Sequence, residues 1–266
     1  MRHSLALFLL LTLTACKMLE PLPDGSAPGK YMPVEEMYKQ AETELNDGNY
    51  DSAAKLYETL QSRYPYGRYA QQALLEVAYA YYRQGEAESA VSATERFIKQ
   101  YPNHPHIDYA YYVKGLANFN GELSFLRSAG GQDPTERDPK ATHDSFAAFR
   151  DLVTRFPNSK YAADSRIRMQ YLINALAKYE LHVASYYMRR GAHIAAANRA
   201  KGVLTQYPKS PSTRDALQIL VEAYDAMGMN DLRDDAKRTL EKNTGVSAPS
   251  PDINEAAVGE KPGKSW

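Results

Sequence analysis

The stretch GEAESAVSATERFIKQYP, from Gly85 to Pro102, decides the fold. Its pattern is that of one amphipathic helix that begins after a glycine turn and ends at an aromatic–proline pair. The pattern recurs as GNYDSAAKLYETLQSRYP at 48–65 and as GAHIAAANRAKGVLTQYP at 191–208, always with glycine and proline 17 residues apart (102 − 85, 65 − 48, 208 − 191). A fourth copy ends at Pro157, with Lys140 in place of the glycine. This spacing predicts a helical repeat protein.

A first helix is expected ahead of each of these second helices. In residues 69–84, Leu74, Val77, Ala78 and Tyr81 recur at the i, i+3, i+4, i+7 spacing of one helix face. The segment 77–81 also matches the tetratricopeptide signature, with Ala78 as the small residue where the two helices of a pair cross. We therefore predict an all-α fold, a tetratricopeptide-repeat solenoid of five helix pairs with about ten helices.

The spacing between repeats assigns their boundaries within residues 34–243. The expected repeats are 34–65, 66–102, 103–157, 158–208 and 209–243. The third is too long by 18 residues, which predicts an inserted loop at 121–139. The fourth is too long by 14 residues without glycine or proline, which predicts a first helix of about 30 residues. The fifth ends in a charged run, as a capping repeat should.

The N-terminus predicts export and a lipid anchor. Residues 1–15 have a basic start, a short apolar run and small residues before Cys16, which is the outline of a signal peptide. The ending LTAC resembles the lipobox of bacterial lipoproteins, which implies S-diacylglycerol and an N-acyl chain on Cys16 and an outer-membrane destination, because Lys17 follows. Residues 16–33 would then be a flexible tether, and 244–266 a disordered tail.

Composition and motifs argue against an enzyme or a nucleic-acid-binding protein. Lysine plus arginine equals aspartate plus glutamate at 32 each, so no net field attracts nucleic acid. Nucleotide-binding, serine-hydrolase and zinc-protease motifs are absent from the sequence. His104 and His106 fall in a turn between repeats without a third ligand nearby in sequence. We expect no metal and no cofactor other than the covalent lipid.

The remaining candidates lie on the surface, because solenoids bind peptides and partner domains. On the early repeats these candidates are Tyr64, Tyr66, Arg68, Tyr69, Tyr81 and Tyr82. Packing within the repeats is the alternative explanation for most of them. Arg199 occupies a second-helix position where the first repeat has Leu56. A charge at that position indicates either a partner contact or a local salt bridge.

Several segments resemble one family closely. RYPYGRYAQQA at 63–73, HPHIDYAYYVKGL at 104–116, LAKYELHVASYYMRRGA at 176–192 and NRAKGVLTQYP at 198–208, with the lipobox, resemble the BamD family of the outer-membrane β-barrel assembly machinery. The resemblance implies a non-enzymatic scaffold subunit, anchored at the periplasmic face of the outer membrane of a Gram-negative bacterium, that helps insert β-barrel proteins.

The resemblance also implies partners. These are the BamA periplasmic domains, BamC and other accessory lipoproteins, and unfolded outer-membrane clients. Arg199 would contact BamA, Tyr64 and Tyr66 would contact clients, and BamC would lie near the 121–139 loop. One alternative is another periplasmic tetratricopeptide lipoprotein adaptor, for instance in cell-wall coordination. The other is a lipoprotein enzyme that uses acidic residues of the inserted loop.

Overall fold

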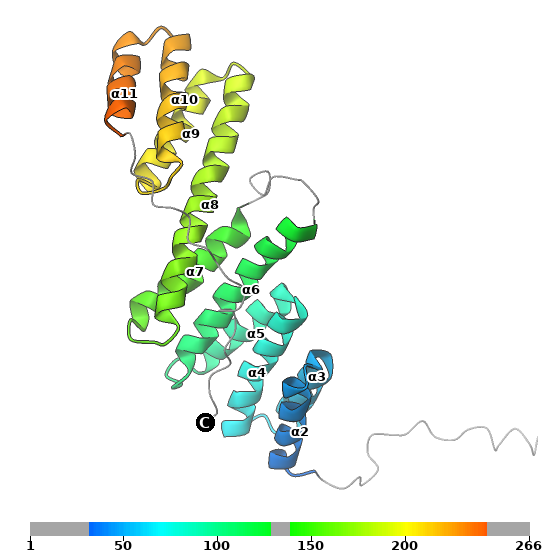
Figure 1. The fold of residues 1–266 in the computed structure, drawn as a ribbon. Coiled ribbons are helices and arrows are strands. Elements are labelled where there is room, and N and C mark those ends of the chain that lie inside the picture. Colours follow the sequence, from blue (N-terminus) through cyan, green and yellow to red (C-terminus); the bar gives the residue numbers. More distant parts are fainter. Residues whose placement is uncertain (1–31, 129–138, 244–266) are drawn as a thin grey trace, which may run out of the picture.

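A computed structural model of the protein describes residues 32–128 and 139–243, and every regular element there is a helix (Figure 1). The all-α prediction is confirmed. The helices are α2 (Val34–Asn46), α3 (Tyr50–Arg63), α4 (Arg68–Gln84), α5 (Ala87–Gln100), α6 (Ile107–Ser128), α7 (Lys140–Arg155), α8 (Ala162–Arg189), α9 (His193–Gln206), α10 (Thr213–Ala226) and α11 (Asn230–Lys242). Signal peptide, Cys16, most of the tether and the tail 244–266 lie outside the described residues.

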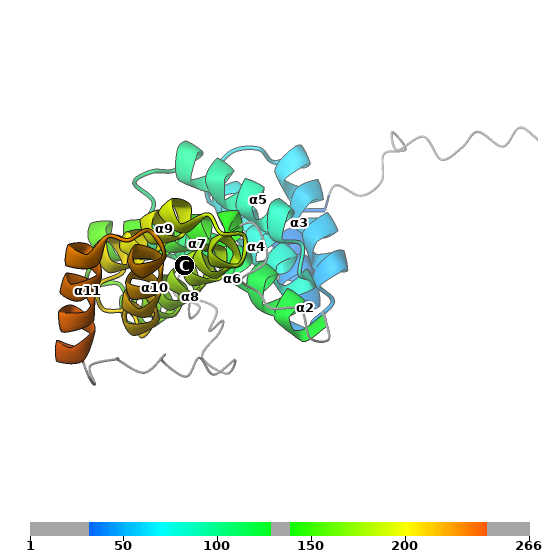
Figure 2. The ribbon, with the colours of Figure 1, turned by 90° about the horizontal axis from the view of Figure 1, so that it is seen from above.

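The ten helices form five pairs that stack one on another. Each helix packs against its neighbours in sequence, and successive first helices also touch, as α2 with α4, α4 with α6 and α8 with α10. Within the described ranges, successive second helices do not come as close to one another as these first helices do. The stack therefore curves toward its first helices. Figure 2 shows the same helix pairs from above.

Glycine and aromatic residues end the helices as the repeat pattern predicts. Gly85 ends α4 with φ +82°, a left-handed conformation that costs glycine little, and its N–H bonds back to the carbonyl of Tyr82. Tyr101 ends α5 with φ −130°, and Pro102 then stops any continuation because it has no N–H. One glycine is required for a different reason. A Cβ on Gly115 would lie 2.5 Å from the Phe149 ring, so its absence lets α6 and α7 cross closely.

Two predictions about the unusual repeats have different outcomes. The long first helix of the fourth repeat is confirmed, since α8 has 28 residues. The sequence predicts an inserted loop at 121–139, but α6 continues to Ser128, so the predicted start of the loop is too early. The segment 121–128 (GELSFLRS) holds one glycine and no proline, so helix propagation outweighs the roughly 1 kcal/mol cost of that glycine. Residues 129–138 lie outside the described part.

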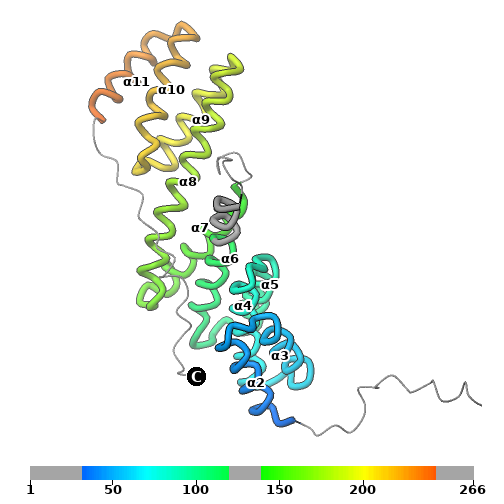
Figure 3. Tube along the Cα trace, turned by 45° about the vertical axis from the view of Figure 1, so that its right-hand side comes forward, coloured from blue at the N-terminus to red at the C-terminus, as the bar shows by residue number. Residues whose placement is uncertain are grey.

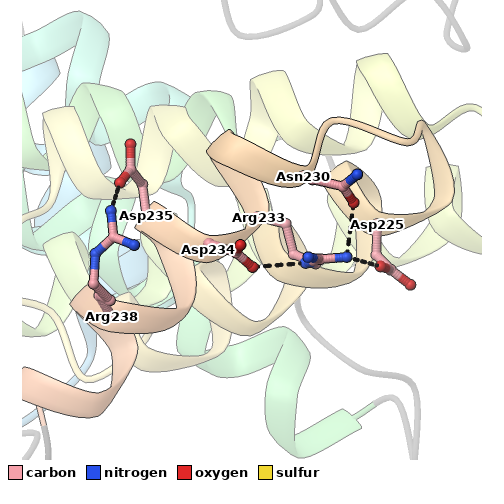
Figure 4. Close-up of polar contacts among 6 residues, drawn as sticks. All are labelled: Asp225, Asn230, Arg233, Asp234, Asp235 and Arg238. Atoms are coloured by element: carbon pink, nitrogen blue, oxygen red, sulfur yellow. Dashed lines mark hydrogen bonds and ion pairs between the residues drawn. The ribbon is translucent and has the colours of Figure 1, made fainter.

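The last helix has the polar surface expected of a cap. Ala236 is the one buried side chain of α11, and charged residues cover the outer side. Arg233 donates hydrogen bonds to Asp225 at 2.8 Å, to Asn230 at 2.9 Å and to Asp234 at 2.9 Å, while Arg238 pairs with Asp235 (Figure 4). These pairs keep the open end of the stack soluble without adding a further helix pair.

Candidate functional site

Tyr64 and Tyr66 both lie in the turn between α3 and α4, but they have different environments. Tyr64 ends α3 with φ −129°, the same backbone conformation that Tyr101, Phe156 and Tyr207 adopt at the ends of their helices. Its ring packs against the core, and its hydroxyl donates to the carbonyl oxygen of Met32 at 2.9 Å. Tyr64 is therefore a packing residue of the repeat.

Tyr66 is the exposed member of this turn. Its side chain is 89% exposed, and it precedes Gly67, whose φ of +90° turns the chain into α4. Beside it, the exposed Arg68 donates to the Tyr69 hydroxyl at 3.0 Å and lies 4.8 Å from the centre of that ring. We call Tyr66, Arg68 and Tyr69 the N-terminal turn surface. Aromatic faces beside a cation suit a peptide that carries both apolar and acidic groups.

Two other tyrosines among the surface candidates do not belong to this surface. Tyr82 is buried, with 5% exposure, so the prediction of a surface role for it is wrong. Tyr81 donates a 2.5 Å hydrogen bond to Glu58, and this bond, with burial, raises the pKa of Tyr81 to about 12. That bond ties α4 to α3. Tyr81 therefore contacts the preceding repeat, and Tyr82 lies in the first hydrophobic core.

Arg199 lies on α9 and is both paired and half exposed. Its Nη1 donates to the two carboxylate oxygens of Glu180 on α8, at 3.0 and 3.2 Å. This hydrogen bond and the charge of Glu180 raise the pKa of Arg199. The side chain remains 44% exposed. The local salt bridge is thus present, and it holds the guanidinium at the surface, where its remaining N–H groups can meet a partner carboxylate.

The structure does not bring the two predicted surfaces together. The N-terminal turn surface lies beside α3 and α4, whereas Arg199 lies on α9, and these helices are far apart along the stack (Figure 1). They also belong to different hydrophobic cores. One core runs from Met37 to Leu172, and the other from Ala177 to Ala236. The two predicted surfaces are therefore separate in the structure.

The long helix α8 runs from the first core into the second (Figure 3), and a largely buried ion pair lies in its first half. Arg168 is fully buried, pairs with Asp164 at 2.6 Å, and lies 4.9 Å from the centre of the Phe119 ring on α6. Asp164 also accepts a 2.8 Å hydrogen bond from Tyr112 of α6. Burial and the Asp164 charge raise the pKa of Tyr112. We call Tyr112, Phe119, Asp164 and Arg168 the joint.

Sequence reasoning missed the joint. An Asp–Arg pair four residues apart on a helix usually lies on a solvated face, so nothing in the spacing distinguishes this pair. The α6 and α8 backbones approach less closely than those of other successive first helices in the described ranges, and bulky side chains fill the wider gap. Besides the ion pair, Tyr112 stacks on Tyr161 with ring centres 4.6 Å apart.

The described residues offer no arrangement for a metal ion. Groups of three or more histidine, cysteine or acidic side chains that could hold one are absent there. His104 uses its Nδ1 to accept a 3.1 Å hydrogen bond from the backbone N–H of His106. Burial, with a smaller contribution from His106, lowers the pKa of His104. Within the same residues, every helix is too short or too polar to cross a membrane.

A stack of five helix pairs with these repeat signatures defines the class of tetratricopeptide-type solenoids. Residues 30–240 match the YfiO family, described as outer membrane lipoprotein. An outer membrane protein assembly factor BamD from Neisseria meningitidis serogroup A is 46% identical over 88% of this chain and 87% of that protein. One from Neisseria gonorrhoeae is 49% identical over 79% of each. The chain belongs to the BamD family of outer membrane lipoproteins.

A solved structure, that of a thermophilic tetratricopeptide protein from Thermus thermophilus, is more distant. It covers 80% of this chain and 92% of its own length, with a TM-score of 0.39 and 16% identity. That likeness is too remote to place any residue of this chain.

Proposed function

We propose that the protein is a subunit of the machinery that assembles β-barrel proteins in the outer membrane. The observation that carries this proposal is the 46% identity, over 88% of the chain, to a protein named as an outer membrane protein assembly factor. Membership in a family described as outer membrane lipoprotein supports the location. The protein would act as a scaffold rather than as an enzyme, since its relatives are named as assembly factors.

The two surfaces suit two kinds of partner within such a machine. The N-terminal turn surface would receive unfolded clients, because Tyr66 offers exposed aromatic area beside the cationic Arg68. Arg199 would contact an acidic group on the periplasmic domains of BamA, since it is held at the surface by Glu180. BamC, with other accessory lipoproteins, would lie near the third repeat and its 121–139 insert. Tyr64 contributes to client binding only by fixing the turn.

Reversal of the charge at Arg199, followed by purification of the bound partners, gives the main test of this function. After mild-detergent purification of the tagged protein from membranes, mass spectrometry should find a stoichiometric barrel protein with periplasmic repeats. Arg199→Glu should reduce its recovery about tenfold or more, since it replaces a salt bridge by repulsion from both Glu180 and the partner. Arg96→Glu, at an exposed position on α5, is the matched control and should leave recovery unchanged.

A third variant distinguishes loss of the contact with the partner from loss of the ion pair between Arg199 and Glu180. Glu180→Gln removes the intramolecular partner but keeps the Arg199 charge, so it should retain most of the barrel protein. Equal recovery from all three variants would remove Arg199 from the interface. Cell-wall synthases in place of the barrel protein would overturn the proposed function and leave the fold untouched.

The lipid anchor on Cys16 is tested separately. We expect Cys16→Ala to abolish incorporation of labelled palmitate and to move the protein from the membrane to the soluble periplasmic fraction. Several acyl chains on one residue hold a protein at a bilayer where a single chain does not. Lys17→Ala is the control, and it should stay acylated and membrane-bound. Palmitate incorporation that persists without Cys16 would disprove the anchor.

A further inference from the structure

One face of α8 is buried in the first half of the helix and exposed in the second half. Its residues recur every three or four positions, so they lie in one line along the helix. The buried members, each at most 4% exposed, are Ser165, Arg168, Leu172 and Leu176. The members that follow, which we call the open stripe, are Tyr179, Val183, Tyr186 and Arg190. Tyr179 and Val183 are half-buried, whereas Arg190 is exposed and Tyr186 is 48% exposed.

The same positions of two other first helices are buried, and most of them hold alanine. The helices α4, α8 and α10 are aligned by the glycine that follows each of them, which is Gly85, Gly191 and Gly228. The first three residues of the open stripe lie 12, 8 and 5 residues before Gly191 (191 − 179, 191 − 183, 191 − 186). Their counterparts at the same distances are Ala73, Val77 and Ala80 of α4 and Ala216, Leu220 and Ala223 of α10. Each counterpart is at most 4% exposed, so the two tyrosines of the open stripe replace buried alanines.

The open stripe is exposed because the preceding helix pair packs on the other half of α8. In the second repeat α4 packs against the pair before it, α2 and α3, and in the fifth α10 packs against α8 and α9. The pair before α8 is α6 and α7, and it packs on the first half of α8, where Tyr112 bonds to Asp164 and Phe119 lies against Arg168. Because α8 has 28 residues against 17 in α4, its second half extends past that pair. The apolar residues of the open stripe belong to neither hydrophobic core.

The end of the open stripe is cationic. Arg190 and the adjacent Arg189 are exposed, and within the described part of the chain neither side chain forms an ion pair. The sequence holds no aspartate or glutamate at 181–214, and Glu180, just before that stretch, is bound by Arg199. Arginines in the last turn of a helix suit the negative end of its dipole. Their exposed guanidinium groups can also bind carboxylates of a partner.

We propose that the open stripe binds an amphipathic helix of a partner protein, in the place that the preceding second helix occupies beside α4 and α10. The apolar residues of this helix would recur every three or four positions, the spacing with which helices pack against one another. Small side chains would lie opposite Tyr179 and Tyr186, because these rings fill space that alanine leaves free in the other repeats. Carboxylates would lie at the end that meets Arg189 and Arg190. The inference does not depend on the proposed function.

Photocrosslinking of the full chain in living cells tests the proposal. The photoreactive residue benzoylphenylalanine replaces Tyr179, Val183 or Tyr186, one at a time. The control is the same replacement at Lys237, which is exposed on α11. All three positions of the open stripe should crosslink to one and the same protein, and the control position should not. Mass spectrometry should map the crosslinked segment to a helix with small and apolar residues three or four positions apart and with carboxylates at one end.

Charge reversal then tests the cationic end in the same assay. Arg189→Glu/Arg190→Glu should reduce crosslinking from position 186 about tenfold or more, because it replaces attraction by repulsion. Arg96→Glu/Lys99→Glu, at exposed positions on α5, makes the same change of charge elsewhere and should leave crosslinking unchanged. Circular dichroism verifies that each variant is folded.

Three results would overturn the proposal. The first is the absence of crosslinks from the open stripe, or crosslinks to an extended or basic segment. The second is crosslinking that is indifferent to the charge reversal at Arg189 and Arg190. The third is a crosslink within the same chain or to a second copy, because the open stripe would then be covered by this protein itself.

Discussion

The first three helix pairs are packed with aromatic side chains, whereas the last two are packed largely with alanine. Tyr57, Phe97, Tyr109 and Phe149 are among the fully buried side chains of the first core. In the second core, eight of the thirteen buried residues are alanine, and the others are leucine, isoleucine or valine. Apolar area removed from water is worth about 25 cal/mol per Å², so the first core gains more stability per repeat.

The two ends of the stack therefore rest on cores of unequal packing. A strongly packed N-terminal stack fixes the turn that carries Tyr66, and a lightly packed C-terminal stack carries Arg199. Both depend on α8, because its first half belongs to one core and its second half to the other. The buried ion pair of the joint is located where α8 enters the first core.

The joint should give the largest single effect. Asp164→Ala leaves the buried Arg168 charge without its carboxylate, and we expect it to lower the free energy of unfolding by about 3–5 kcal/mol. Urea denaturation followed by circular dichroism measures this change. The double variant Asp164→Ala/Arg168→Met should lower the free energy of unfolding by less, because no uncompensated buried charge remains. If the two variants are equally unstable, charge burial is not what matters at the joint.

Equivalent positions in the two cores give the next largest effect. Phe97 and Val203 each lie 12 residues after the glycine that opens their repeat helix (97 − 85, 203 − 191), and both are fully buried. Phe97→Ala should cost about 3–5 kcal/mol. Val203→Ala removes two methyl groups, worth roughly 1.6 kcal/mol at about 0.8 kcal/mol each. Thermal or urea unfolding of the two variants would refute the comparison if Val203→Ala proved the more damaging.

The two tyrosines of the N-terminal turn should give the smallest effects, and the two should differ. Tyr64→Phe removes the hydrogen bond to the Met32 carbonyl and should cost about 0.5–1.5 kcal/mol. Tyr66→Phe and Tyr66→Ala should both change stability by less than about 0.5 kcal/mol, because that side chain is 89% exposed. Differential scanning calorimetry resolves the three variants. A destabilisation from Tyr66→Ala as large as from Tyr64→Phe would mean that Tyr66 also packs.

Much of this architecture could be predicted from the sequence because repeat packing is local. The glycine at each turn, the proline after each second helix and the small residue at each crossing all act within one repeat. One sequence period was therefore enough to predict the number of pairs and the length of α8. The end of α6 was harder to predict, since Gly121 is a weak helix breaker when good helix formers follow it.

The contacts between repeats were not predictable in the same way. Whether Tyr81 and Tyr82 face a partner or the neighbouring helices of the stack depends on the angle at which helices cross, which sequence spacing does not state. Arg168 has the sequence signature of a surface residue, and its burial follows from the wide approach of α6 and α8. Arg199 was recognisable as unusual, but its pairing with Glu180 depends on the register between α8 and α9.

Two unequally stable stacks are joined through α8, and native-state hydrogen exchange of the full chain tests this difference most directly. Amides of α9 and α10 should exchange through openings of distinctly lower free energy than amides of α4 and α6, with the change located within α8 between Leu172 and Ala177. One common opening free energy across all five helix pairs, or greater protection in α9 and α10, would contradict the account.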